Sequence, residues 1–370
     1  MKSVVFVVAL LAVGIYFYSW YIFATILVLS FLVFFHELGH FLVARMLGVC
    51  VNIFSIGFGQ KLIKKRIGQT EYAISAIPLG GYVQLKGQDD SDPRHKNYDP
   101  DSYNSVGPLG RIAILFAGPF FNFILAFFIF IAIGFMGVDK FAPVVGKVLE
   151  GSAGASANLK PGDKILYIND VLIKEWDDIK KNVKTELTTI QIERNNQIIN
   201  LTLTPKISQG RTMFGEIEQR AMIGISPSGD IVKLYYSGFD AVKYAYKETI
   251  EASKLIFLGL KKLVEGVVPL KEVGGIVQIT DITAKAAKSD FVVLLIITAL
   301  LSVNLGVLNL LPIPALDGGH IVFNLYELIF RREVSEKAFT YLTYFGWAIL
   351  FSLMILATFN DVMRLSEGVK

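Results

Sequence analysis

The sequence predicts a polytopic α-helical membrane protein with four or five transmembrane helices, a membrane-associated β-hairpin region and an inserted extracytoplasmic β domain. Three observations predict this class. Of the 370 residues, 53% are hydrophobic and only 18% are charged, whereas ordinary soluble domains carry about 25% charged residues. Long apolar runs with few or no charges recur along the chain, and strand-like polar segments separate them. A membrane protein therefore fits the composition better than a soluble one.

The transmembrane helices are predicted from apolar runs of 18 residues or more. Residues 4–17 are apolar but short, so they are either an additional span or an interfacial helix, and the number of spans stays open at four or five. A cleaved signal peptide is less favoured, because no clear small-residue cleavage site follows this segment. The spans that the pattern predicts clearly are 21–47, 112–136, 291–311 and 338–360.

The two longer connections contain β structure and an amphipathic helix. The first alternates and is rich in glycine, which is typical of β-hairpins, and it ends in a polar loop. The second begins with short β-like runs within 144–205 and continues into a helical pattern at 235–268 that could lie on the membrane surface. The predicted regions, in chain order, are 1–47, 48–111, 112–137, 138–210, 211–290, 291–320 and 338–360.

The distribution of charge predicts the orientation and excludes one class of partner. Lysine and arginine gather in the first and third connections, which would therefore be cytoplasmic, and the β domain would lie on the opposite side. The net charge of +4, with no basic run interleaved with aromatic residues, argues against nucleic-acid binding. Cys50 is the only cysteine, so no intrachain disulfide forms, and we interpret it as a small interface residue.

The strongest motif for chemistry is His36-Glu37-Leu38-Gly39-His40, an HExxH sequence within the first clear span. On a helix, positions i and i+4 share one face, so both imidazoles could bind one zinc ion. The glutamate could then take a proton from water at the metal. Ionisable groups within a membrane span are usually functional; the alternative is a polar cluster that packs against other helices.

A third zinc ligand is predicted at Asp317. The metzincin pattern is excluded, because Val43 and Met46 stand where it requires glycine and histidine. Pro312 and Pro314 interrupt the helix after the third clear span, so Asp317 is expected in an irregular, glycine-flanked loop. The topology brings that loop to the same face as the HExxH motif. The alternative for this aspartate is a simple Asp-Gly turn.

Four further polar residues are candidates for lesser roles. Asn304 and Asn309 lie on the third span and could hydrogen-bond the substrate backbone or a developing oxyanion, or could join neighbouring helices. Asn122 lies early in the second span and is expected to hold that helix against the motif helix, because Gly118 allows close approach. His320 is expected to be structural or to support the ligands, and we assign no role to His95 in the first polar loop.

Three motifs together resemble the site-2 protease family, in particular its bacterial RseP-type branch. They are HELGH at 36–40, AGPFFNF at 117–123 and NLLPIPALDGGH at 309–320. The segments 54–59 and 77–83 resemble the membrane-associated β region of that branch. The resemblance covers essentially the whole chain. It implies an intramembrane zinc protease in which His36, His40 and Asp317 bind Zn²⁺, Glu37 is the general base, and Asn304 and Asn309 bind substrate.

The same resemblance implies further expectations about partners and location. The β domain resembles a single PDZ domain, with Lys160-Pro-Gly-Asp163 as its turn, although members of this branch often carry two. Expected substrates are single-span membrane proteins, such as trimmed anti-sigma factors or remnant signal peptides. The expected location is the bacterial inner membrane, with the active site near the cytoplasmic face and the β domain outside.

Two alternative functions fit the sequence less well. A transporter or channel would explain ionisable residues within spans, but not the HExxH spacing with a distant aspartate at matching depth, and the spans show no inverted repeat. A non-catalytic adaptor whose β domain binds C-termini would be favoured by a degenerate motif, but both the motif and the aspartate are intact. The predicted reaction is therefore zinc-assisted hydrolysis of a peptide bond, in which the substrate could pair as a strand with the 57–83 hairpins.

Overall fold

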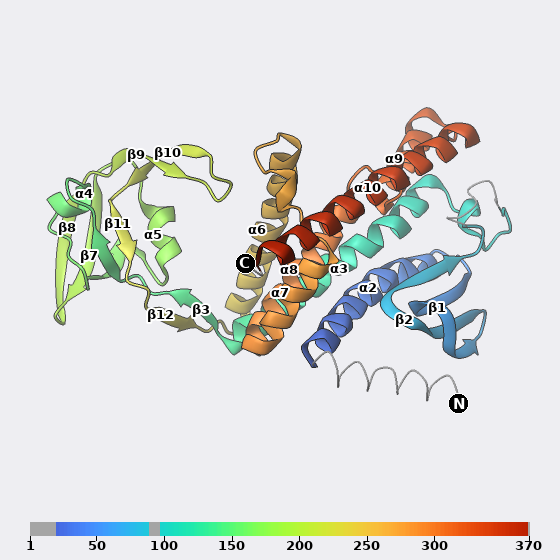
Figure 1. Cartoon of the computed structure of the whole chain (residues 1–370), viewed down its shortest axis with the longest axis horizontal. Coiled ribbons are helices and arrows are strands. Elements are labelled where there is room, and N and C mark those ends of the chain that lie inside the picture. Colours follow the sequence, from blue (N-terminus) through green and yellow to red (C-terminus); the bar gives the residue numbers. More distant parts are fainter. Residues whose placement is uncertain (1–19, 89–96, 369–370) are drawn as a thin grey trace. The chain divides into compact units, whose positions relative to one another are not determined.

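The computed structural model of the chain describes residues 20–88 and 97–368, which form two compact units (Figure 1). One unit contains the described residues up to Ile133 together with those from Ala241 on, and the other is Gly134–Asp240. Each unit has a hydrophobic core of its own. The additional span considered at 4–17 and the position of His95 lie outside the described residues.

Four helices of the described part are long and apolar enough to cross a membrane, which confirms the prediction of a polytopic membrane protein. A helix satisfies its backbone hydrogen bonds internally, as a bilayer requires. Large apolar side chains on their surfaces, such as Phe128 and Ile355, are well exposed and suit contact with lipid. These helices are α2 (Trp20–Met46), α3 (Pro108–Met136), α8 (Phe291–Asn309) and α10 (Glu336–Gly368).

The predicted hairpin region is one long pair of strands, β1 (Val51–Ile67) and β2 (Thr70–Leu85). Both strands bend, so that each pairs twice: residues 53–56 of β1 lie between residues 71–74 and residues 81–84 of β2. The reversal in β1 occurs at Gly57, where φ is +88° and a Cβ would lie 2.8 Å from the Ile77 carbonyl oxygen. The result is a small sheet whose 81–85 segment forms one edge.

This sheet packs directly against α2. The Ser30 hydroxyl of α2 donates to the Pro78 carbonyl of β2, and the rings of Phe34 and Phe41 contact the ring of Phe54 in β1. A buried cluster formed by residues such as Ala44, Val51 and Ile114 joins the sheet to α2 and α3. The sheet is therefore held beside the helix that carries the HExxH motif.

Three further helices complete this unit: α6 (Phe239–Val264), α7 (Ile276–Ser289) and α9 (Asp317–Phe330), with 3₁₀ turns at Tyr103–Ser105 and Leu270–Glu272. Helix α6 agrees with the amphipathic pattern seen in the sequence. Helix α9 differs from expectation, because Asp317 was predicted in an irregular loop and is instead the first helical residue. Glycines 318 and 319 suggested a turn, yet both are buried in the first turn of α9.

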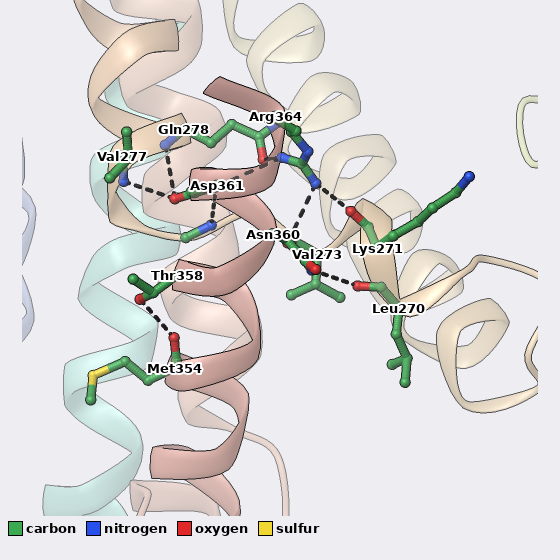
Figure 2. A network of polar contacts seen from close by, with 11 residues as sticks. Leu270, Lys271, Val273, Val277, Gln278, Met354, Thr358, Asn360, Asp361 and Arg364 are labelled. Carbon is green, nitrogen blue, oxygen red and sulfur yellow. Dashed lines mark hydrogen bonds and ion pairs between the residues drawn. The ribbon is translucent and has the colours of Figure 1, made fainter. Parts of the chain in front are cut away.

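The carboxylate of Asp361 in α10 caps the N-terminus of α7 (Figure 2). It accepts hydrogen bonds from the backbone N–H groups of Gly275, Val277 and Gln278 at 3.1, 3.0 and 3.2 Å. Gly275 precedes α7 and has no side chain with which to cap the helix, and a Cβ there would lie 2.7 Å from Asp361 Oδ2. The cap of α7 is therefore supplied by a distant helix.

Two neighbours of Asp361 bind the segment 270–273, which precedes α7, to α10 by donating hydrogen bonds to its carbonyl groups (Figure 2). Asn360 donates to the carbonyls of Leu270 and Val273, and Arg364 donates to the carbonyl of Lys271 at 2.7 Å. Helix α7 itself packs against α2 and α8. The C-terminal part of α10 thus fixes α7 beside the helix that carries the HExxH motif.

The second unit is built from short strands and two small helices around an apolar core. Ile165, Ile168, Ile190 and Ile192 are fully buried there, and Trp176 packs against them. The helices are α4 (Ala153–Ser156) and α5 (Trp176–Asn182). The strands are β3 (Val138–Phe141), β4 (Val145–Val148), β5 (Lys164–Ile168), β6 (Val171–Leu172), β7 (Thr188–Arg194), β8 (Gln197–Leu203), β9 (Lys206–Arg211), β10 (Ile217–Met222), β11 (Ile225–Pro227) and β12 (Ile231–Leu234).

This unit extends further along the chain than the region 138–210 assigned to the β domain. Residues 211–234, expected as part of a linker, contain β10, β11 and β12. Strands β11 and β12 pair with β4 and β3, whose partner residues lie 77–82 and 90–96 positions earlier in the chain. Such short strands are stabilised by distant partners, so the local sequence pattern gives little sign of them.

Candidate metal centre

Helix α2 places His36 and His40 on one face, one turn apart. Their Nε2 atoms are 3.1 Å from each other. His36 is only 7% exposed, although it lies in an otherwise apolar helix. The spacing of the HExxH motif on a helix accounts for this geometry, because side chains at i and i+4 are neighbours on the helix surface.

Asp317 reaches the same point from the first turn of α9. Its Oδ2 lies 3.2 Å from His36 Nε2 and 3.5 Å from His40 Nε2. The backbone at Gly318 passes very close to the end of α8. A Cβ on Gly318 would lie 2.4 Å from the Leu310 carbonyl oxygen, so a larger residue would not fit there. The two glycines therefore allow α9 to begin close against the end of α8 and bring the carboxylate to the imidazoles.

The Asp317 carboxyl is anionic, as a metal ligand must be. Burial by itself would raise the pKa of this carboxyl, but when no metal is bound and the imidazoles carry protons, the charge on His40 and hydrogen bonds from both imidazoles hold the pKa below its ordinary value. An anionic oxygen and two imidazole nitrogens are a donor set that zinc prefers.

The distances among the three atoms fit a tetrahedral zinc site. Zinc binds nitrogen and carboxylate oxygen at about 2.0–2.2 Å, so ligand atoms at two corners of its tetrahedron are about 3.3 Å apart. The observed separations are 3.1, 3.2 and 3.5 Å. With these three residues as the protein ligands, a fourth corner would stay open, which is the arrangement of catalytic rather than structural zinc.

The outer nitrogens of both imidazoles have partners on α3. Nδ1 of His40 lies 2.8 Å from the Ile114 carbonyl oxygen, to which it donates, and this leaves the Nε2 lone pair directed at the centre. Nδ1 of His36 lies 3.1 Å from the side-chain amide of Asn122. Sequence reasoning assigned Asn122 to helix packing and missed this contact, since the contact depends on how α3 is rotated against α2.

Helix α3 comes unusually close to the motif because of two glycines. A Cβ on Gly39 would lie 2.3 Å from the Ala117 carbonyl oxygen, and one on Gly118 would lie 2.2 Å from His40 Nε2. Any larger residue at 118 would occupy space that the imidazoles fill. The close approach that the sequence suggested for Gly118 therefore brings α3 into direct contact with the two imidazole rings.

Glu37 points toward the edge of the sheet. Its Oε2 accepts a 3.0 Å hydrogen bond from the backbone N–H of Val83 in β2. A Cβ on Gly81 would lie 3.6 Å from Glu37 Cγ, so the 81–85 segment runs alongside this side chain. The structure thus brings together the three sequence-predicted ligand residues, the glutamate and an edge strand.

A cavity of about 330 Å³ adjoins Asp317. Aromatic side chains such as Phe339 and Trp347 form much of its wall. Its polar part contains the ion pair of Arg111 and Glu327, whose closest atoms are 2.6 Å apart. The cavity could receive a side chain of a peptide bound at the centre.

The remaining sequence candidates lie elsewhere or contribute differently. Asn304 and Asn309 are partly buried on α8, and within the described residues neither side chain forms a hydrogen bond with the three ligand candidates. His320 lies one turn into α9, where its ring contacts Phe323 and lines the cavity. Cys50 is partly buried with its Sγ 3.9 Å from Asn52 Oδ1.

Comparison with known proteins shows similarity along nearly the whole chain. Residues 24–353 match the model of peptidase family M50. A Campylobacter jejuni protein named "Putative zinc metalloprotease" is 51% identical over 365 residues, which cover 99% of both chains. A Helicobacter pylori J99 protein of the same name is 40% identical, over 92% of this chain and 98% of its own. The regulator of sigma-W protease RasP of Bacillus subtilis is 29% identical, over 92% of this chain and 98% of its own.

Proposed function

Because the chain belongs to peptidase family M50, the site-2 protease family, and is a multi-pass membrane zinc metalloprotease, we propose that His36, His40 and Asp317 hold its zinc ion. We propose further that Glu37 is the general base. The reaction is hydrolysis of a peptide bond in the membrane-spanning segment of a single-span protein. The observation that carries the proposal is the set of separations among the three ligand atoms, 3.1, 3.2 and 3.5 Å.

The residues divide the chemistry between them. A zinc ion bound by such ligands supplies Lewis acidity, which polarises a carbonyl group and makes water more acidic. Glu37 removes a proton from the attacking water and later delivers it to the leaving amine. The N–H of Val83 donates to Oε2 of Glu37 and so orients the carboxylate. Asn304 and Asn309 contact the substrate backbone.

The sheet edge beside Glu37 suits an unwound substrate. A transmembrane helix hides its backbone in internal hydrogen bonds, so it must open locally before its peptide bonds can be attacked. An extended segment that adds to the 81–85 edge regains those hydrogen bonds as a new strand. Since Val83 also contacts Glu37, a strand bound at this edge lies next to the general base.

The second unit, Gly134–Asp240, is proposed to be a single PDZ-like domain on the extracytoplasmic side. Its four-stranded sheet in the order β6-β5-β7-β8 and the turn at Lys160–Asp163 support this assignment. The positive-inside rule supports placing the zinc site near the cytoplasmic face of the bacterial inner membrane. We propose trimmed anti-sigma factors or remnant signal peptides as substrates, and the name of RasP, which refers to sigma-W, supports the first of these.

The decisive experiment compares the wild-type protein with Glu37→Gln in detergent. Each protein is incubated with a tagged single-span substrate, and its zinc content is measured. The expected result is cleavage by the wild type only, with about one zinc ion per chain in both proteins. Cleavage by Glu37→Gln at the wild-type rate would contradict the role of Glu37. Equal zinc content after His36→Ala would contradict the proposed ligand set.

A further inference from the structure

The side chain of Asn122 is completely buried beside the outer nitrogen of His36. Asn122 lies on α3 and is 0% exposed. Its Nδ2 is 3.1 Å from His36 Nδ1, and its Oδ1 has no hydrogen-bond partner within the described residues. A buried amide with one end at an imidazole and the other end unpaired needs an explanation.

The chemistry of imidazole supplies the explanation. If His36 binds a metal through Nε2, the ring proton must reside on Nδ1, and a buried N–H there needs an acceptor. Among the described residues, the Asn122 amide is the group placed to provide one. The oxygen and nitrogen of an amide exchange places when the group turns by 180°, and the two orientations have nearly the same shape. Turning the amide places Oδ1 opposite Nδ1 and moves Nδ2 to the position that lacks a partner within the described residues, so the Nδ1–H of His36 gains an acceptor.

We propose that Asn122 is a positioning residue of the zinc centre, which accepts a hydrogen bond from His36 Nδ1–H and so fixes the metal-binding tautomer and the orientation of that ring. This inference rests on the ligand role proposed for His36. It concerns one atom pair, Asn122 Oδ1 and His36 Nδ1. Groups that hold a metal-binding histidine in this way determine how strongly the metal is bound.

Helix α8 packs against α3 at the level of Asn122. The hydroxyl of Ser302 in α8 donates a 2.8 Å hydrogen bond to the Asn122 carbonyl oxygen, and Ser302 is itself 0% exposed. A Cβ on Gly306, one turn further along α8, would lie 3.1 Å from the Pro119 carbonyl oxygen. Helix α8 therefore packs tightly on α3 at this level.

The two histidines differ in a way that makes the proposal testable. His40 is oriented by a backbone carbonyl, that of Ile114, which no side-chain substitution removes. His36 is oriented by a side chain, which can be changed. Asn122→Leu keeps the approximate volume but removes the acceptor, whereas Asn122→Asp keeps an acceptor in the same place. Ser302→Ala is the matched control, because it removes a buried hydrogen bond at the same helix crossing without touching His36.

The experiment measures zinc affinity by competition with a chelator, on full-length proteins in detergent, together with the thermal stability of each metal-free form. We expect Asn122→Leu to bind zinc about 10- to 100-fold more weakly, while Asn122→Asp and Ser302→Ala stay within a few-fold of the wild type. Zinc affinity of Asn122→Leu equal to that of the wild type overturns the proposal. So does an equal loss in Asn122→Leu and Ser302→Ala, which would indicate helix packing alone.

The His36→Ala protein separates this proposal from the one it rests on. If His36→Ala loses zinc and Asn122→Leu does not, the ligand set stands and only the role of Asn122 fails. If His36→Ala retains wild-type zinc affinity, the ligand set itself is wrong. Should Asn122→Leu fail to fold, the comparison of Asn122→Asp with Asn122→Ser decides the matter, because serine is too short to reach Nδ1. Equal zinc affinity in these two proteins then overturns the proposal.

Discussion

The carboxylate of Glu37 accepts a 3.0 Å hydrogen bond from the backbone N–H of Val83, so the HExxH helix and the edge of the β sheet are joined at the residue proposed as general base. This contact connects two parts of the sequence, 46 residues apart, with different tasks. The helix carries two of the three proposed zinc ligands and the proposed base. The sheet supplies an edge at which an extended peptide can bind.

The first prediction tests the use of that edge through Val83→Pro. Proline has no N–H, so it removes the donor to Glu37 and also disturbs the strand that would pair with substrate. We expect cleavage of a helical transmembrane substrate to fall further than cleavage of an unstructured peptide, with zinc content unchanged. The measurement is kcat/KM for both substrates.

Two comparisons sharpen this test. Val83→Ala keeps the backbone N–H and should retain cleavage of both substrates close to the wild-type level. If Val83→Pro lowers cleavage of the helical and the unstructured substrate by the same factor, the amide serves only to hold Glu37, and strand pairing at this edge is wrong.

The second prediction concerns the space beneath the imidazoles. In Gly118→Ala, the added methyl group would lie 2.2 Å from His40 Nε2 and 2.9 Å from His36 Cε1, so the rings or helix α3 must move. Forced overpacking of this kind costs about 1–3 kcal/mol. We expect zinc affinity to fall by at least about 10-fold, measured by chelator competition.

Gly107→Ala is the control for this change, because no atom of the described residues lies within 4 Å of a Cβ at position 107. That protein should bind zinc and cleave substrate like the wild type. Wild-type zinc affinity in Gly118→Ala would show that α3 can withdraw from the histidines without cost, and the close packing would then be irrelevant to the metal.

Much of the helical framework could be predicted from the sequence, because apolar runs of membrane length depend on composition alone. The predicted spans 112–136 and 291–311 agree closely with α3 and α8. The convergence of His36, His40 and Asp317 could also be predicted. The two histidines are four residues apart on one helix, and the alternating direction of successive spans brings Asp317 to the same side of the membrane. Their roles as ligands remain a proposal.

Other features depend on tertiary contacts that no local pattern encodes. Asn122 faces His36 only because α3 is rotated in one particular way, which Gly39 and Gly118 permit. The sequence did not predict that α9 starts at Asp317, because the two glycines that follow usually indicate a turn. In the structure they allow close packing against the end of α8. Strand β12 is stabilised by pairing with β3, so its own short sequence does not predict a strand.

The third prediction concerns the cavity beside Asp317. Thr343 lines this cavity from α10, and Thr343→Phe would fill part of it. If the cavity receives a substrate side chain, cleavage of substrates with a large residue there should fall by at least about 10-fold. Zinc content should not change, because Thr343 is not among the ligand candidates. The measurement is kcat/KM on substrates that differ at one residue near the cleaved bond.

Thr358→Phe provides the matched control, since both threonines lie on α10 and each donates to the carbonyl four residues earlier, at 2.9 and 2.8 Å. Thr358 is exposed and lies outside the residues that line the cavity. If both substitutions reduce cleavage equally, the effect comes from α10 as a whole, and the cavity is not a substrate pocket.

The fourth prediction addresses the cap that α10 places on α7. Asp361 is 2% exposed and accepts three backbone hydrogen bonds. In Asp361→Asn, one oxygen becomes an NH₂ group, which cannot accept, so at least one of the bonds with Gly275, Val277 and Gln278 is lost. Hydrogen bonds to a charged group contribute about 1.5–3 kcal/mol each.

The expected result is local opening of α7, because the four N–H groups at the start of a helix have no partner within it. Amide hydrogen exchange over residues 276–289 should become faster in Asp361→Asn, while exchange in α3 stays unchanged. Thr358→Val, one turn earlier on α10, leaves the cap intact and should preserve the protection of α7. Unchanged protection in Asp361→Asn would mean that packing of α7 against α2 and α8, rather than the carboxylate, holds this helix in place.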